Sequence, residues 1–90
     1  MAMDNKMKIL IPNEEFKAKL IGKEGSNIKT FEEITGVNVI IDGTLGAIFL
    51  EAADFDKLEV ARYMMERLAR GGKITPELIR NYKKIYGGSQ

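Results

Sequence analysis

A chain of 90 residues with a formal net charge of +1 is long enough for one small domain with a single hydrophobic core. Hydrophobic residues make up 44% of the chain and charged residues 30%, a globular composition that excludes a disordered or membrane-embedded chain. Because domains that coat nucleic acid by bulk electrostatics are strongly basic, we expect only modest affinity for any such partner. No apolar run approaches the roughly 18 residues of a membrane span, so we expect a cytoplasmic protein without direct membrane contact.

The sequence contains no cysteine and no histidine. It therefore offers no disulfide, no thiolate nucleophile, no imidazole base and no histidine metal ligand. Acidic residues such as Asp42 and Asp54 have no evident catalytic partner. We expect no catalytic residue, no metal and no other cofactor.

The first part of the chain predicts a strand and two short helices. Residues 7–11 are apolar apart from one lysine, and Pro12 ends this strand. Residues 13–21 place apolar side chains at helical spacing up to a glycine stop, Gly22. A second helix should cover residues 26–35.

The next part predicts a β-hairpin followed by a long helix. Residues 37–42 are dense in β-branched side chains, and residues 47–52 form a second apolar run after a link of hairpin length. The two strands should pair antiparallel. Apolar residues at helical spacing then extend from a cap at Asp54 or Asp56 to the stop at Gly71-Gly72.

A last helix is predicted by Thr75, a helix cap, and Pro76 in the first helical position. The order strand, helix, helix, strand, strand, helix predicts an α+β fold, a three-stranded antiparallel sheet with helices on one face. We predict a main domain over residues 7–71 and a C-terminal helical extension over residues 73–86.

Strand alternation places three apolar side chains, Leu10, Ile40 and Phe49, on the sheet face away from the helices. An open patch of this kind is unfavourable for a lone domain, so we expect the terminal helix, a second protomer or a neighbouring domain to cover it. The alternative is an alternation shifted by a bulge.

The joint between the first two helices carries the clearest chemical signal. Two glycines three apart frame a lysine and a glutamate, and Ser26 is available to cap the second helix. The first turn of a helix leaves N–H groups unpaired and binds anions, and glycine lets a sugar-phosphate backbone approach closely. The candidate contacts here are Ile21, Gly22, Lys23, Glu24, Gly25, Ser26, Asn27, Ile28 and Lys29. For Asn27 and Lys29 the alternative is a solvated helix residue.

The string I-G-K-E-G-S-N-I-K at residues 21–29, followed by Thr35-Gly36 and the strand at 37–42, resembles the KH domain of RNA-binding proteins. The resemblance implies a type I KH fold whose glycine loop grips the backbone of about four single-stranded nucleotides. It also implies an apolar groove for the bases, lined by Ile21, Ile28, Val39, Ile40 and Ile41. The second strand should lie at the sheet edge, with free N–H and C=O groups for base edges.

Over residues 9–86 the chain looks like the KH segment of bacterial ribonuclease Y, through I-P-N-E-E-F-K at 11–17 and G-K-I-T-P at 72–76. In that family the segment lies between a membrane-anchored coiled coil and a metal-dependent HD hydrolase domain. The resemblance implies a parent endoribonuclease of RNA degradation, anchored at the inner face of the cell membrane. The family usually has arginine at positions 23 and 26, so Lys23 and Ser26 predict a weaker grip on phosphate.

Two functions therefore remain open. The first is a module that binds single-stranded RNA, with single-stranded DNA as the alternative ligand. The second is a protein-interaction or homodimerisation module with weak or no nucleic acid binding, favoured by the low net charge and the apolar sheet face.

Overall fold

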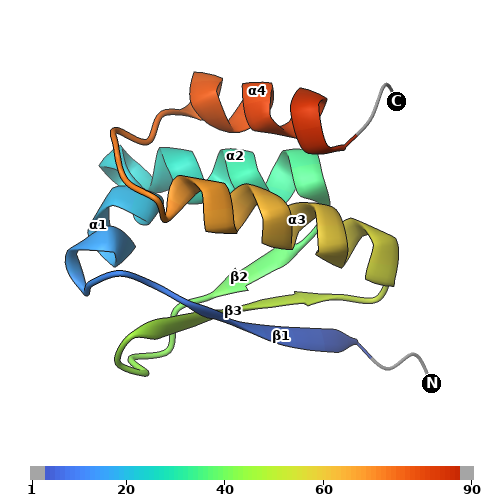
Figure 1. Ribbon diagram of the computed structural model, residues 1–90, viewed down its shortest axis with the longest axis horizontal. Helices are drawn as coiled ribbons and strands as arrows, with labels where there is room; N and C mark the ends of the chain where they lie inside the picture. The colour runs from blue at the N-terminus through green and yellow to red at the C-terminus, as the bar shows by residue number, and fades with distance from the viewer. Residues whose placement is uncertain (1–3, 88–90) are drawn as a thin grey trace.

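The computed structural model describes residues 4–87 as a three-stranded sheet with helices on one face (Figure 1). The strand order is β1-β3-β2, and both outer strands run antiparallel to β3. The predicted α+β architecture is therefore confirmed, and the second strand does lie at an edge. The elements in chain order are β1 (Asn5–Leu10), α1 (Glu15–Ile21), the 3-10 turn η1 (Lys23–Gly25), α2 (Ser26–Thr35), β2 (Asn38–Ile40), β3 (Ala47–Ala52), α3 (Phe55–Leu68) and α4 (Pro76–Tyr86).

The second strand is shorter than the predicted range 37–42. Its pairing with β3 covers only Asn38–Ile40. The N–H of Val37 donates to the Thr35 hydroxyl at 3.1 Å, which places Val37 in the turn that follows α2. At the other end, the Thr44 N–H donates to the Asp42 carboxylate at 3.0 Å, a local turn that leaves the sheet. Side-chain bonds to the backbone therefore end the strand on both sides.

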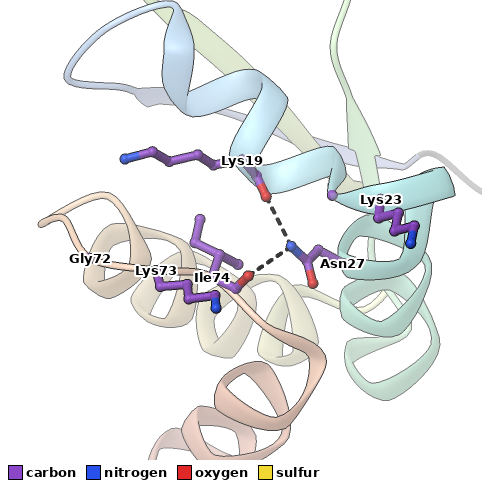
Figure 2. Close-up of a pocket in the computed structure, with 7 residues that line it drawn as sticks. Lys19, Lys23, Asn27, Gly72, Lys73 and Ile74 are labelled. Atoms are coloured by element: carbon purple, nitrogen blue, oxygen red, sulfur yellow. Dashed lines mark hydrogen bonds between the residues drawn. The ribbon is translucent and has the colours of Figure 1, made fainter.

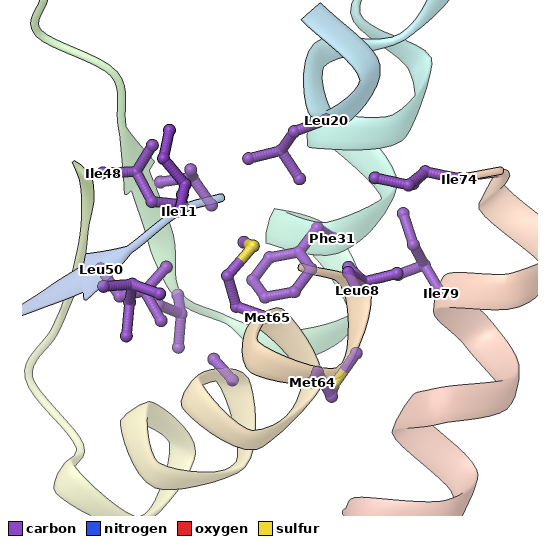
Figure 3. Close-up of a cluster of buried hydrophobic side chains, with 14 of the residues drawn as sticks. Ile11, Leu20, Phe31, Ile48, Leu50, Met64, Met65, Leu68, Ile74 and Ile79 are labelled. Atoms are coloured by element: carbon purple, nitrogen blue, oxygen red, sulfur yellow. The ribbon is translucent and has the colours of Figure 1, made fainter. Parts of the chain in front are cut away.

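The core lies between the sheet and the helices (Figure 3). Phe31 of α2 is fully buried, and Met65 and Leu68 of α3 lie on the same side of the sheet. From β3, Ile48 and Leu50 point into this layer because alternate residues of a strand face the same side. The regular apolar spacing of α2, α3 and β3 thus forms one continuous core.

Side-chain caps fix the starts of the last two helices at the predicted positions. The Asp54 carboxylate accepts from the N–H groups of the first turn of α3, at 2.8 and 3.3 Å. The Thr75 hydroxyl accepts from the Leu78 N–H at 3.1 Å, with Pro76 in the first turn of α4. Each cap satisfies N–H groups that a helix start leaves unpaired.

The helix α4 packs on the helical layer, not on the sheet. It contacts α2 and α3, and its Ile79 joins the shared core together with Ile74 of the preceding linker. Figure 1 shows α4 on the side of the molecule opposite the strands. The expectation that the terminal helix covers the outer sheet face is therefore wrong. The predicted boundary between residues 71 and 73 stays a prediction.

The outer sheet face is apolar at its centre and open. Leu10 is 74% exposed, whereas Phe49 and Ile40 are half-buried. Phe49 lies opposite Ile40 in the sheet register, and the Lys6 ammonium lies 4.8 Å from the centre of the Phe49 ring. The predicted alternation is therefore confirmed, without a bulge, and the lysine stem covers part of the aromatic ring.

Candidate nucleic-acid interface

The joint between α1 and α2 is a short loop with three consecutive turns of unusual backbone. Gly22 has φ 75°, Glu24 has φ 53° and Gly25 has φ 77°. Only glycine adopts such angles without steric cost, so the two glycines define the loop and Glu24 carries backbone strain. The result is an exposed tip, with the side chains of Lys23 and Glu24 in solvent.

The two glycines serve different purposes. A Cβ atom on Gly22 would lie 2.6 Å from the Asn27 amide nitrogen, so the first glycine makes room for a side chain of the protein itself. A Cβ on Gly25 would meet nothing closer than 3.9 Å. Gly25 is therefore required by its backbone angle alone, and its surface side remains open to a ligand.

Ser26 does not cap α2, contrary to the sequence prediction. Ser26 has helical angles, and the position before it is Gly25, which has no side chain to accept a hydrogen bond. The 3-10 turn also bonds two loop amides internally: the Gly25 N–H donates to the Gly22 carbonyl at 3.2 Å, and the Ser26 N–H donates to the Lys23 carbonyl. These two N–H groups are therefore not free for an anion in this structure.

Asn27 is buried, with only 4% of its surface exposed, so the prediction of a solvated helix residue is wrong. Its amide nitrogen donates to the Lys19 carbonyl at 2.9 Å and to the Ile74 carbonyl at 3.0 Å (Figure 2). One side chain thus ties the end of α1 to the linker before α4. A phosphate contact by Asn27 stays a prediction, and the sequence offered one signal for burial: the position precedes Phe31 by one helical turn.

The predicted apolar groove residues divide between two faces. Ile21 at the end of α1 is 38% exposed and Ile28 of α2 is half-buried. Val39 and Ile41 lie on the helix side, where Val39 belongs to the core and Ile41 packs against it. The side chain of Ile40 instead lies on the outer sheet face, so only its backbone remains a groove candidate.

The free edge of β2 is partly occupied. The Val39 N–H donates to a carboxylate oxygen of Glu32, in α2, at 2.8 Å. The prediction that the edge N–H groups are free for bases is therefore wrong at Val39, because a side chain from the helix layer already pairs with it. Lys29 and Lys23 are exposed beside the loop.

The described residues show no group of three or more Asp or Glu side chains that could hold a metal ion. Of the helices described between residues 4 and 87, none is long and apolar enough to cross a membrane. The charged side chains near the loop are single lysines and one glutamate, suited to binding an anion rather than a cation.

Residues 6–67 match the family model of the KH domain. The chain belongs to the KH domain family. The match covers the loop, the three strands and most of α3, and it ends before the linker to α4. Together with the strand order, it confirms the predicted type I KH fold.

This KH chain is similar to curated ribonuclease Y proteins. It is 46% identical over 80 residues to ribonuclease Y of Fusobacterium nucleatum, covering 84% of this chain and 16% of that protein. The protein from Acidothermus cellulolyticus is 48% identical over 80 residues, covering 89% of this chain and 16% of that protein. The chain therefore spans about a sixth of the length of these relatives.

A solved structure shares the fold. A chain in the crystal structure of the a/eIF2alpha-aDim2p-rRNA complex from Pyrococcus horikoshii aligns with a TM-score of 0.72 at 20% identity. The alignment covers 93% of this chain and 48% of that chain. Because it extends beyond residues 6–67, the shared architecture is not limited to the segment that the family model matches.

Proposed function

We propose that this KH domain binds single-stranded RNA through the loop Gly22-Lys23-Glu24-Gly25. The observation that carries the proposal is the exposed loop tip at an interhelical joint, where two glycines and one strained residue bring the main chain to the surface. The similarity to ribonuclease Y and the KH family match support RNA as the ligand.

In this proposal the loop holds the sugar-phosphate backbone of about four nucleotides. The open side of Gly25 allows close approach, and Lys23 supplies a mobile cation at the tip. Because few phosphates are neutralised, affinity should decrease only gently with salt.

The bases would lie between Ile21 and Ile28 on one side and the edge strand β2 on the other. Unpaired bases stack and pack well on apolar side chains, whereas a duplex would not enter so narrow a site. Base recognition at the Val39 N–H would require the Glu32 carboxylate to leave it. That exchange replaces one hydrogen bond by another and selects bases with an acceptor at the matching position.

We also propose that the domain is the RNA-binding part of a ribonuclease Y-like endoribonuclease. The identity of 46 to 48% to two such proteins supports this parent. In such a parent, catalysis would reside in other domains, and this segment would present the RNA strand.

The test is the double variant Lys23→Asp/Glu24→Asp, measured by fluorescence anisotropy with labelled randomised RNA octamers. We expect affinity to fall by about tenfold or more, because a cation is replaced by an anion at the phosphate contact. The matched control Lys84→Asp makes the same charge change at an exposed position of α4 and should bind normally. Unchanged affinity of the double variant would reject the loop as the clamp.

The alternative function, protein interaction or homodimerisation, is favoured by the open outer sheet face around Leu10 and Phe49. Sedimentation velocity with Phe49→Asp distinguishes the two functions. A dimer that this substitution abolishes, in a protein without affinity for RNA octamers, would support the alternative. A monomer that binds RNA supports the clamp.

A further inference from the structure

A cavity of about 470 Å³ lies between the end of α1 and the linker from α3 to α4. Figure 2 shows Lys19, Lys23, Asn27 and Lys73 around it, from three separate segments of the chain. A second cavity of about 210 Å³ adjoins it, since Lys19 and Gly72 line both. We call the two cavities together the linker groove. It includes residues beyond position 67, outside the segment that matches the KH family.

The linker groove is basic although the whole chain is nearly neutral. Its lining includes Lys19, Lys23, Arg70 and Lys73 and no aspartate or glutamate. In the described part of the chain, the ion pairs involve Lys17 and Arg62, and none involves these four cations. Because neighbouring like charges repel one another, four cations gathered along one groove favour an anionic ligand.

One buried acceptor in the groove has no partner. The Oδ1 atom of Asn27 is buried and accepts no hydrogen bond from any described residue. The amide cannot turn to relieve this, because its nitrogen already donates to the carbonyls of Lys19 and Ile74. Buried acceptors are normally paired, so this atom calls for a donor. Inorganic phosphate dianion or a carboxylate has no such donor, whereas a ribose hydroxyl has.

We propose that the linker groove is a second binding site for the RNA backbone, resting on the proposed function of the glycine loop. Lys19, Arg70 and Lys73 would bind phosphates, and a ribose 2′-hydroxyl would donate to Asn27 Oδ1. Gly22 and Lys23 belong both to the glycine loop and to the groove lining, so the two sites are continuous. A strand held by the loop therefore extends over the linker, and the footprint exceeds about four nucleotides.

The proposal makes length the deciding variable. Labelled randomised RNA of four and of ten nucleotides is titrated by anisotropy with the wild type and with Arg70→Glu/Lys73→Glu. Both residues are exposed, so the substitutions should leave folding intact. The matched control Arg80→Glu/Lys84→Glu changes charge equally on the exposed surface of α4, away from the groove lining.

We expect the groove variant to bind the decamer about tenfold more weakly, with a shallower salt dependence by about 0.7 per lost phosphate contact, and the tetramer within about twofold of wild type. The control should match the wild type at both lengths. Equal loss at both lengths, or normal decamer binding, overturns the proposal. Equal wild-type affinity for RNA and DNA decamers overturns the role of the 2′-hydroxyl.

The two proposals fail in different ways. If the wild-type decamer depends on Arg70 and Lys73 but Lys23→Asp/Glu24→Asp has no effect at either length, the loop clamp fails and the groove remains. If the loop variant abolishes binding at both lengths while the groove variant binds normally, the groove fails and the clamp remains.

Discussion

Replacing Asn27 by alanine tests whether one buried amide joins the glycine loop to the α4 linker. The substitution removes two hydrogen bonds, to the Lys19 carbonyl at 2.9 Å and to the Ile74 carbonyl at 3.0 Å. A typical hydrogen bond contributes about 1 kcal/mol net, and a buried carbonyl left unpaired costs about 1–3 kcal/mol. The unpaired Oδ1 atom and the better helix propensity of alanine offset part of this, so we expect a loss of about 2 kcal/mol.

Urea unfolding at 25 °C measures this loss directly. The matched control is Asn81→Ala, at an exposed position of α4, which should change stability by less than about 0.5 kcal/mol. The near-isosteric Asn27→Asp separates hydrogen bonding from packing, because its carboxylate would face two carbonyl oxygens. Burial and those oxygens would raise the pKa of the new carboxyl, so its stability deficit should grow as pH rises through that pKa. A loss below about 0.5 kcal/mol for Asn27→Ala would refute the bridging role.

Three further outcomes follow from the same structure. Gly25→Ala should cost about 1–2 kcal/mol for its positive φ alone, and Gly22→Ala should cost more in urea unfolding, because its Cβ would lie 2.6 Å from Asn27; equal costs would contradict the packing account. Thr75→Ala should lower stability by about 1 kcal/mol through the lost cap of α4, whereas Thr75→Ser should not. The N–H of Gly46 and then a lysine ammonium lower the folded pKa of Glu14 below 4.5, so this group contributes stability above pH 4.5 that is lost as pH falls through the folded value. Thermal unfolding between pH 7 and 3 should therefore show a smaller acid loss in Glu14→Gln than in the wild type.

Local sequence signals were sufficient for most elements of the fold. The caps at Asp54 and Thr75 and the apolar spacing of α3 and α4 act within a few residues, so the sequence predicts those helices well. The start of α2 was different. Ser26 is a favourable cap by type, but the 3-10 turn and the left-handed Gly25 bring the helix in without one.

The parts of the site that the sequence did not predict depend on contacts between distant residues. Asn27 bonds to Ile74, 47 positions away, and no local pattern indicates that pairing. The bond from the Val39 N–H to Glu32 likewise depends on how α2 lies against the sheet edge. The position of α4 was mispredicted because its apolar stripe fits either layer, and only the packing of Ile79 distinguishes them.

The most direct test of the loop clamp is an NMR titration of the ¹⁵N-labelled protein with randomised RNA tetranucleotides. We expect the largest amide shifts at Gly22-Lys23-Glu24-Gly25, with smaller ones at Ile28 and Val39 as bases enter the groove and Glu32 is displaced. Shifts confined to the outer sheet face around Phe49, with the loop amides unmoved at saturating RNA, would contradict the account.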